Sequence, residues 1–210
     1  MSDAARLRIL VIGASGELGR AVVAELSPRH DIVTAGSKSG DVRIDISDPD
    51  SIVAGLKAAG TLDAVVCAAD AVNFAPLSAI SPATLEKSSY GLGLINKVMG
   101  QVNLALAARD VLGDNGSISL IAGVLADDPI VAGSSASMVN GAVESFVKAA
   151  AIELPRGLRI NAISPTVFEE SMGGYGPFFR GFDPVPVLRA ARAFSRSVEG
   201  RQTGQIYKVI

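Results

Sequence analysis

A short apolar run that ends in a glycine-rich turn, with a helical pattern directly behind it, constrains this chain more than any other feature. The run spans residues 7–12, and the turn reads Gly13-Ala14-Ser15-Gly16-Glu17-Leu18-Gly19. Leu18, Val22 and Leu26 then recur at intervals of four, which gives a helix one apolar face. A strand, a turn and a helix N-terminus in this order aim backbone N–H groups and the positive end of a helix dipole at one place. The motif therefore predicts a pyrophosphate site and dinucleotide binding.

The three glycines of this turn have separate expected roles. Gly13 allows the tight turn, Gly16 lets the backbone approach the phosphates, and Gly19 lets the helix pack closely against the strand. The alternative is a glycine-rich turn in an ordinary α/β domain, and the strand before it and the helix after it favour the dinucleotide. The residues expected to bind are Gly13, Ser15, Gly16, Glu17, Leu18 and Gly19.

The composition fits one domain, residues 1–210, with a buried aliphatic core. Hydrophobic residues make up 49% of the chain and aromatic residues 5%, with no Trp, which favours strands buried on both faces. The formal charge of −2 and the lack of a basic stripe argue against a nucleic-acid partner and leave a small-molecule ligand. The single cysteine, Cys67, permits no disulfide framework and no metal cluster. The only histidine, His30, is expected to be a solvated turn residue.

No leader or membrane-spanning segment is expected, because residues 7–12 are far too short an apolar run to cross a bilayer. A cytoplasmic protein without membrane contact is the resulting expectation.

Apolar segments alternate with helical patterns along most of the chain. Helices are expected to open at Ser47-Asp48-Pro49-Asp50, at Ser81-Pro82 with a break near 91–93 and an end at Leu112, and at Ser134, which would cap a helix reaching Leu154. The alternation implies parallel pairing through right-handed crossovers. We expect an α/β fold class, a doubly wound, mostly parallel sheet of about seven strands with helices on both faces. The strand candidates are residues 7–12, 32–35, 42–44, 64–68, 117–121, 158–163 and 205–209.

Residues 166–186 are the least regular stretch and follow the end of a predicted strand, where ligands of open α/β sheets bind. Two interpretations stay open. The segment is a mobile loop that covers a substrate, or a surface loop whose phenylalanines fill an apolar patch.

The residues after the second predicted strand bear on which dinucleotide binds. No carboxylate for a ribose 2′-hydroxyl is present there, whereas Ser37 and Lys38 could receive a 2′-phosphate. One or two charge-assisted hydrogen bonds at about 1.5–3 kcal/mol each predict at least about tenfold preference for NADP(H) over NAD(H). The alternative is that Lys38 is a solvated loop charge. By position alone, Asp45 and Ile46 are expected near the adenine, and Ala68 and Ala69 beside the ribose.

Three stretches together resemble the short-chain dehydrogenase/reductase family over nearly the whole chain. They are the glycine turn, Asn140-Gly141-Ala142-Val143-Glu144-Ser145-Phe146, and Arg159-Ile160-Asn161-Ala162-Ile163-Ser164-Pro165-Thr166. The resemblance implies a Rossmann fold that binds NAD(P) and transfers hydride between the nicotinamide and an alcohol or carbonyl. It also implies that Pro165, Thr166 and Val167 lie near the nicotinamide amide.

The chain departs from the family pattern at the catalytic positions. Alignment on Gly141 puts Ala136 at the place of the family tyrosine, Asn140 at that of the lysine and Gly123 at that of the serine. Lys97 stands where the family has the asparagine of its central helix. The glycine spacing is that of the family's atypical branches, which suggests a divergent short subgroup.

Two residues are the candidates for the remaining chemistry. Lys97 could polarise a carbonyl and donate a proton, or it could be a structural lysine that bonds strand-end carbonyls. Asn140 could hydrogen-bond ribose hydroxyls, or it could be a polar residue satisfied within the helix packing. Ser134, Ser135 and Tyr175 are weaker candidates.

The expected function is an NADP(H)-dependent oxidoreductase acting on a small carbonyl or alcohol, by analogy with the family. The alternative is a catalytically inactive NADP(H)-binding regulatory or sensor protein. The family further implies a homodimer or homotetramer that pairs through residues 97–112 and 134–154.

Overall fold

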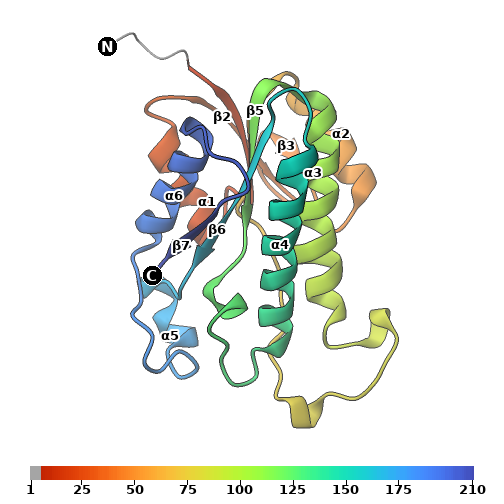
Figure 1. Cartoon of the computed structure of the whole chain (residues 1–210), viewed down its shortest axis with the longest axis vertical. Helices are drawn as coiled ribbons and strands as arrows, with labels where there is room; N and C mark the ends of the chain where they lie inside the picture. The colour runs from red at the N-terminus through yellow and green to blue at the C-terminus, as the bar shows by residue number, and fades with distance from the viewer. Residues whose placement is uncertain (1–5) are drawn as a thin grey trace.

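Seven parallel strands form one sheet in the computed structural model, which describes residues 6–210 (Figure 1). The order across the sheet is β3-β2-β1-β4-β5-β6-β7, and every neighbouring pair is parallel. The predicted doubly wound sheet is confirmed, and each predicted strand is present. The strands are β1 (Arg8–Ile12), β2 (Asp31–Gly36), β3 (Val42–Arg43), β4 (Leu62–Cys67), β5 (Leu112–Ile121), β6 (Arg159–Pro165) and β7 (Ile206–Val209).

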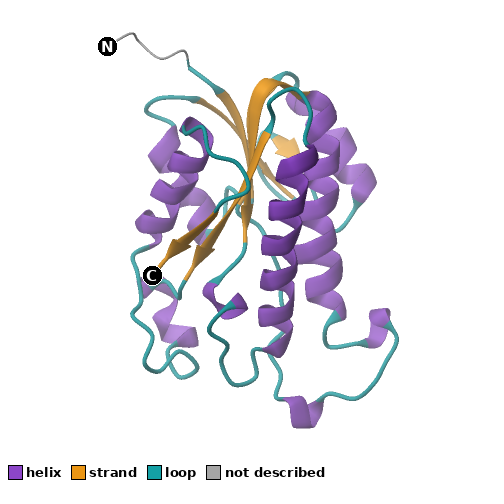
Figure 2. Cartoon of the chain, in the orientation of Figure 1, coloured by secondary structure: helices purple, strands orange, loops and turns teal. Residues whose placement is uncertain are grey.

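Helices cover both faces of the sheet (Figure 2). One face carries α2 (Pro49–Ala59), α3 (Gly100–Val111) and α4 (Ser134–Glu153), and the other carries α1 (Glu17–Leu26) and α6 (Val187–Glu199). A short helix, α5 (Met172–Tyr175), lies beyond the ends of the last strands. No helix among residues 6–210 is long and apolar enough to cross a membrane.

Strand β1 shows why the central strands are apolar throughout. Leu10 and Ile12 pack in the core on the side of α2, α3 and α4. Ile9 and Val11 pack in the second core, on the side of α1 and α6. Because successive side chains of a strand point to opposite faces, a strand with helices on both sides buries every residue.

The start of α2 follows the predicted capping chemistry. The Asp48 carboxylate accepts a hydrogen bond of 3.0 Å from the backbone N–H of Asp50, and Pro49 occupies the first turn. This satisfies one of the amide groups that a helix N-terminus leaves without a partner.

Two helix starts differ from the prediction. No helix opens at Ser81-Pro82, since regular helical bonding begins where Leu94 N–H donates to the Tyr90 carbonyl at 3.0 Å. The chain turns back sharply before that point, and a β-carbon on Gly91 would lie 2.2 Å from the Leu85 carbonyl oxygen. The first turns, Gly93–Met99, are π-helical and continue into α3. Ser134 does not cap α4, because its hydroxyl bonds the Tyr90 hydroxyl at 3.0 Å.

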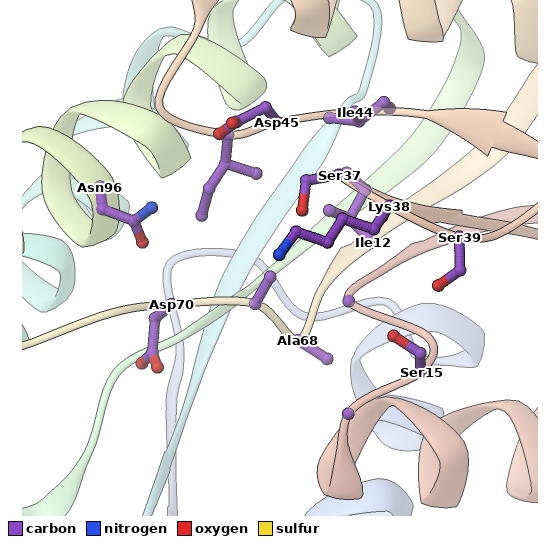
Figure 3. A pocket seen from close by; sticks show the side chains of 15 residues that line it. Ile12, Ser15, Ser37, Lys38, Ser39, Ile44, Asp45, Ala68, Asp70 and Asn96 are labelled. Atoms are coloured by element: carbon purple, nitrogen blue, oxygen red, sulfur yellow. The ribbon is translucent and has the colours of Figure 1, made fainter.

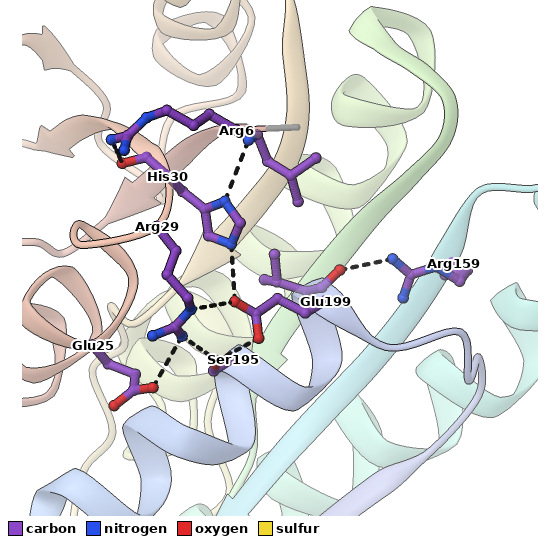
Figure 4. A network of polar contacts seen from close by, with 9 residues as sticks. Arg6, Glu25, Arg29, His30, Arg159, Ser195 and Glu199 are labelled. Carbon is purple, nitrogen blue, oxygen red and sulfur yellow. Dashed lines mark hydrogen bonds and ion pairs between the residues drawn. The ribbon is translucent and has the colours of Figure 1, made fainter. Parts of the chain in front are cut away.

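His30 is buried rather than solvated, which corrects the expectation for this turn. Its ring is 7% exposed, and Nε2 lies 2.9 Å from the Glu199 carboxylate (Figure 4). Burial raises the pKa of Glu199, but hydrogen bonds from Arg29, His30 and Ser195 outweigh it and hold the pKa below its ordinary value. The cluster joins the end of α6 to the start of β2, so the histidine has a structural partner that lies far away in the sequence.

Candidate functional site

A cavity of about 430 Å³ opens at the carboxyl ends of the first strands, beside the glycine turn (Figure 3). The size suits a small ligand. It gathers most of the residues predicted to hold a dinucleotide, which come from four separate segments of the chain. They are Gly13, Ser15, Gly16, Ser37, Lys38, Asp45, Ile46, Ala68 and Ala69.

The glycine turn leaves backbone surface exposed to this cavity. A β-carbon on Gly13 would lie 2.9 Å from the Ala68 carbonyl oxygen, and its φ of 81° also favours glycine. Gly16 is the N-cap of α1, so the first amides of that helix lie beside the cavity. Gly19 does not line it; a β-carbon there would lie 2.0 Å from the Gly13 carbonyl oxygen, which makes this glycine a packing residue. A cradle of backbone and a helix N-terminus fit a pyrophosphate.

The end of β2 presents hydroxyl groups and one amine to the same cavity. Figure 3 shows the Lys38 side chain crossing the cavity with its amine near Ser37 and away from Ser39. The nearby Asp41 carboxylate instead accepts hydrogen bonds from the Thr34 N–H at 2.9 Å and the Thr34 hydroxyl at 2.8 Å. These bonds lower the pKa of Asp41. Asp41 is therefore engaged by Thr34 and is not among the residues that line the cavity.

Asp45 is tied to the start of α2. Its carboxylate accepts bonds from the Ser47 hydroxyl at 2.6 Å and the Ser47 N–H at 2.9 Å, which lower the pKa of Asp45. The side chain borders the cavity in a fixed orientation.

Two further cavities, of about 320 and 120 Å³, adjoin each other, and we call them together the inner chamber. They share the strand-end residues Pro165, Thr166 and Val167, and the larger one shares Ala68 and Asp70 with the first cavity. Glu17 and Leu18 line the chamber rather than the first cavity. The smaller part is bordered by the four residues that the sequence alignment predicts to differ from the family pattern: Lys97, Gly123, Ala136 and Asn140.

Lys97 is held from two sides. It is 4% exposed, its Nζ donates to the Ala122 carbonyl at 3.0 Å, and it forms an ion pair with Asp70. The bond to a strand-end carbonyl is the arrangement expected of a structural lysine. The ion pair with Asp70 was not predicted, because no sequence pattern connects Asp70 with Lys97.

Two buried polar atoms of the chamber lack a hydrogen-bond partner. They are Oδ1 of Asn140, a residue that is 4% exposed, and the hydroxyl of Thr166, which is 6% exposed. Buried polar groups in proteins are nearly always satisfied by protein, water or ligand. The chamber therefore offers hydrogen-bonding capacity that the described protein leaves unused.

Residues 166–186 wall the chamber with aromatic rings. The centroids of Phe74 and Tyr175 lie 6.0 Å apart, those of Tyr175 and Phe179 6.4 Å, and those of Phe179 and Phe182 5.2 Å. The segment leaves and re-enters the fold at one place, where Phe168 and Val185 form a parallel bridge. This packing agrees with the apolar-patch interpretation, while the position over the chamber agrees with the covering loop.

Loop 166–186 is also fastened to the glycine-turn helix. The Ser171 hydroxyl donates to the Glu17 carboxylate at 2.7 Å. The bond joins residues from opposite ends of the chain, and no local pattern predicts it. Asn96 and Phe74, which line the first cavity and the chamber respectively, were likewise missed.

The chain is similar in sequence and fold to known proteins. Residues 8–197 match the family model described as enoyl-(acyl carrier protein) reductase. The crystal structure of the protein lin1944 from Listeria innocua is 48% identical, with a TM-score of 0.92 over 97% of this chain and 100% of that one. No curated protein matches the chain.

More distant solved structures share the fold. A small-chain dehydrogenase in complex with NADPH is 21% identical, with a TM-score of 0.81 over 98% of this chain and 97% of that one. A short chain dehydrogenase from Burkholderia cenocepacia in complex with NADP is 21% identical, with a TM-score of 0.83 over 97% and 96%.

Proposed function

Since this chain belongs to the short-chain dehydrogenase/reductase family, we propose that it is an NADP(H)-dependent oxidoreductase with an atypical active site. It transfers hydride between the nicotinamide and a small carbonyl or alcohol. One observation carries the proposal: the cavity beside the glycine turn adjoins a chamber in which Lys97 and Asn140 lie with the strand-end residues Pro165, Thr166 and Val167.

The residues of the first cavity are assigned to the cofactor. The amides of Ser15, Glu17 and Leu18 would hold the pyrophosphate, because those of Gly13, Ala14 and Gly16 already donate to backbone carbonyls. Ser37 and Lys38 would hold the 2′-phosphate. Asp45 and Ile46 would border the adenine, Ala68 and Ala69 the ribose, and residues 165–167 the nicotinamide. The NADPH and NADP complexes of the distant structures support this assignment. When bound, the cofactor supplies or accepts the hydride.

The chain's own part in the chemistry centres on one ammonium group. Lys97 holds its protons at the wall of the chamber, where Asp70 and the Ala122 carbonyl fix the position of Nζ. We assign it as the proton donor to a substrate oxygen. Asn140 would orient the substrate or a ribose hydroxyl through its unused amide oxygen. The aromatic loop would exclude water, which strengthens each of these interactions.

A second candidate function is a catalytically inactive NADP(H)-binding regulatory or sensor protein. The observation in its favour is that Gly123 and Ala136 supply no hydroxyl to the chamber, and Lys97 is already bonded twice. With two of its three N–H groups bonded to the protein, this ammonium can serve as a structural group.

The two functions are separated by NADPH oxidation over a panel of small aldehydes and ketones. If Lys97 donates the proton, wild-type turnover falls by about 10²–10⁴-fold in Lys97→Ala. The matched control Lys57→Ala, an exposed position in the last turn of α2, keeps the wild-type rate. Tight NADPH binding without turnover on any substrate supports the sensor. The absence of a thermal shift at saturating NADPH contradicts both.

We also propose a homodimer or homotetramer that pairs through residues 97–112 and 134–154. Leu106 on α3 and Met138 and Ile152 on α4 are exposed in the single chain, which leaves apolar surface on both helices. Light scattering should give a multiple of the 21.5 kDa chain mass, and a monomer mass contradicts the proposal.

A further inference from the structure

The charged groups of the inner chamber leave an unbalanced negative charge. Apart from the Tyr175 phenol, the titratable side chains among its described lining residues are Glu17, Asp70 and Lys97. Lys97 and Asp70 are paired with each other. The remaining formal charge is the Glu17 carboxylate, so the formal charges of the lining side chains sum to −1.

Glu17 is placed where a carboxylate is stable. It lies in the first turn of α1, where the helix dipole favours negative charge. One of its oxygens accepts a hydrogen bond of 2.7 Å from the Ser171 hydroxyl. The other carboxylate oxygen has no hydrogen bond among the described residues, so it can accept one from a ligand.

The aromatic residues that line the chamber also favour a positively charged ligand. Phe74, Tyr175 and Phe179 line the chamber together with Glu17. The faces of aromatic rings carry negative potential and attract cations that are removed from water. Rings and a carboxylate around one space are a recognised way to bind an organic cation.

The unused hydrogen-bonding atoms point to a ligand that donates. Asn140 Oδ1 is buried and accepts no hydrogen bond, and a hydroxyl such as that of Thr166 can accept as well as donate. A carbonyl group has no proton to give to these atoms. A protonated C=N group has an N–H donor and a positive charge.

We propose that the inner chamber takes protonated imines of small aliphatic amines and reduces their C=N bond. The proposal rests on the proposed cofactor and hydride transfer. The hydride supplied by NADPH adds to the imine carbon, the π electron pair moves to nitrogen, and the products are an amine and NADP⁺. The nitrogen already carries its proton, so no proton donor is needed in the step. This explains a reductase site with alanine, asparagine and glycine at positions 136, 140 and 123.

The first test measures binding and does not depend on turnover. Isothermal titration compares pyrrolidine, a cation at pH 7, with cyclopentanol, which has a similar size and no charge. The amine can form one charge-assisted hydrogen bond that the alcohol cannot form. We therefore expect the wild type to bind pyrrolidine at least about tenfold more tightly than cyclopentanol. The preference should disappear in Glu17→Gln, which keeps an acceptor for Ser171. It should persist in the control Glu153→Gln, at the exposed end of α4.

The second test measures reduction of 2-methyl-1-pyrroline against cyclopentanone with NADPH. We expect kcat/KM for the imine to be at least about tenfold higher, and Glu17→Gln to remove most of that difference. If Glu17→Gln does not fold, Tyr175→Leu removes one aromatic face from an exposed position and should weaken pyrrolidine binding while leaving cyclopentanol unchanged.

The outcomes distinguish the two proposals. If the wild type binds no NADPH, the proposed function fails, and the pyrrolidine titration still decides the charge preference of the chamber. If NADPH binds and the ketone is reduced as well as the imine, or pyrrolidine binds no better than cyclopentanol, the imine proposal is overturned and the cofactor assignment stands.

Discussion

A β-carbon added to Gly123 would lie 2.8 Å from Nδ2 of Asn140. Asn140 is almost fully buried, so its amide has little room to withdraw. The sequence analysis predicts that these two residues stand where the family has its catalytic serine and lysine. The two departures are thus physically coupled, because a side chain at 123 and the amide at 140 compete for one space.

Gly123→Ala should lower the free energy of unfolding by about 1–3 kcal/mol, since overpacking a tight site forces side chains from their preferred rotamers. The backbone of Gly123 is extended and accepts alanine, so the cost comes from the contact. In an Asn140→Ala background the same change should cost less by at least about 0.5 kcal/mol. Urea unfolding of the four proteins measures this, and additive effects would show that the two residues are not coupled.

Asp70→Asn should destabilise the protein more than Lys97→Met. The first change leaves a buried ammonium without its anion, which costs about 3–5 kcal/mol at fully buried sites and less here because Asp70 is 32% exposed. The second change removes the charge and keeps an apolar chain of similar length. Thermal unfolding of the two variants shows which is less stable. If Asp70→Asn were more stable than Lys97→Met, the ion pair would be contradicted.

Lys38→Ala should weaken NADPH binding at least about tenfold and NADH binding little, because only NADPH carries the 2′-phosphate. Fluorescence titration of both cofactors provides the measurement. The control is Lys57→Ala, an exposed lysine in the last turn of α2. Equal losses for both cofactors would assign Lys38 to another part of the dinucleotide.

Acid should remove stability through Glu199. Its pKa in the folded protein lies below the ordinary value of 4.5, so the unfolded chain binds the proton first as the pH falls. The stabilisation is therefore complete above about pH 4.5 and is lost as the pH drops through the lower, folded pKa. Glu199→Gln should lose about 1–2 kcal/mol at neutral pH, a modest value because the carboxylate is partly exposed. Its unfolding free energy should also depend less on pH as the pH falls below about 4.5. If the pH dependence of the unfolding free energy were the same in Glu199→Gln and the wild type, Glu199 would not be the source of the acid sensitivity.

Cys67 should be unreactive in the folded protein. Burial raises the pKa of its thiol to about 12, and the reactive thiolate is then scarce at pH 8. Iodoacetamide at that pH should leave the native protein unmodified and add one group per chain in urea. Rapid modification of the native protein would show that β4 opens readily.

Features that depend on neighbouring residues could be predicted from the sequence. The glycine turn, the seven strands and the Asp48 cap each follow from a pattern within about ten residues. The prediction of a helix at Ser81 was wrong. The Ser81-Pro82 pair resembles a helix start but lies in an irregular segment, and the chain reverses direction near Gly91 before the helix begins. Gathering of the cofactor candidates into one cavity follows from the sheet order, since parallel strands end at the same edge.

Features that depend on distant partners could not be predicted. Asp70 meets Lys97, His30 meets Glu199, and Ser171 meets Glu17, and no periodicity connects the members of these pairs. Lys97 was identified as a site residue, but its engagement by Asp70 and Ala122 required the coordinates. Which of the gathered residues touch a cofactor or substrate stays a prediction.

The bridge between Phe168 and Val185 closes residues 166–186 into an excursion whose two ends lie side by side. An excursion of this kind can be lengthened, shortened or exchanged without shifting the register of β6 or the seat of α6. Residues 166–186, which wall the chamber, can therefore change independently of the residues around the first cavity. Replacing this loop, in evolution or by protein engineering, could change the ligand specificity of the chamber while the sheet and its helices stay unchanged.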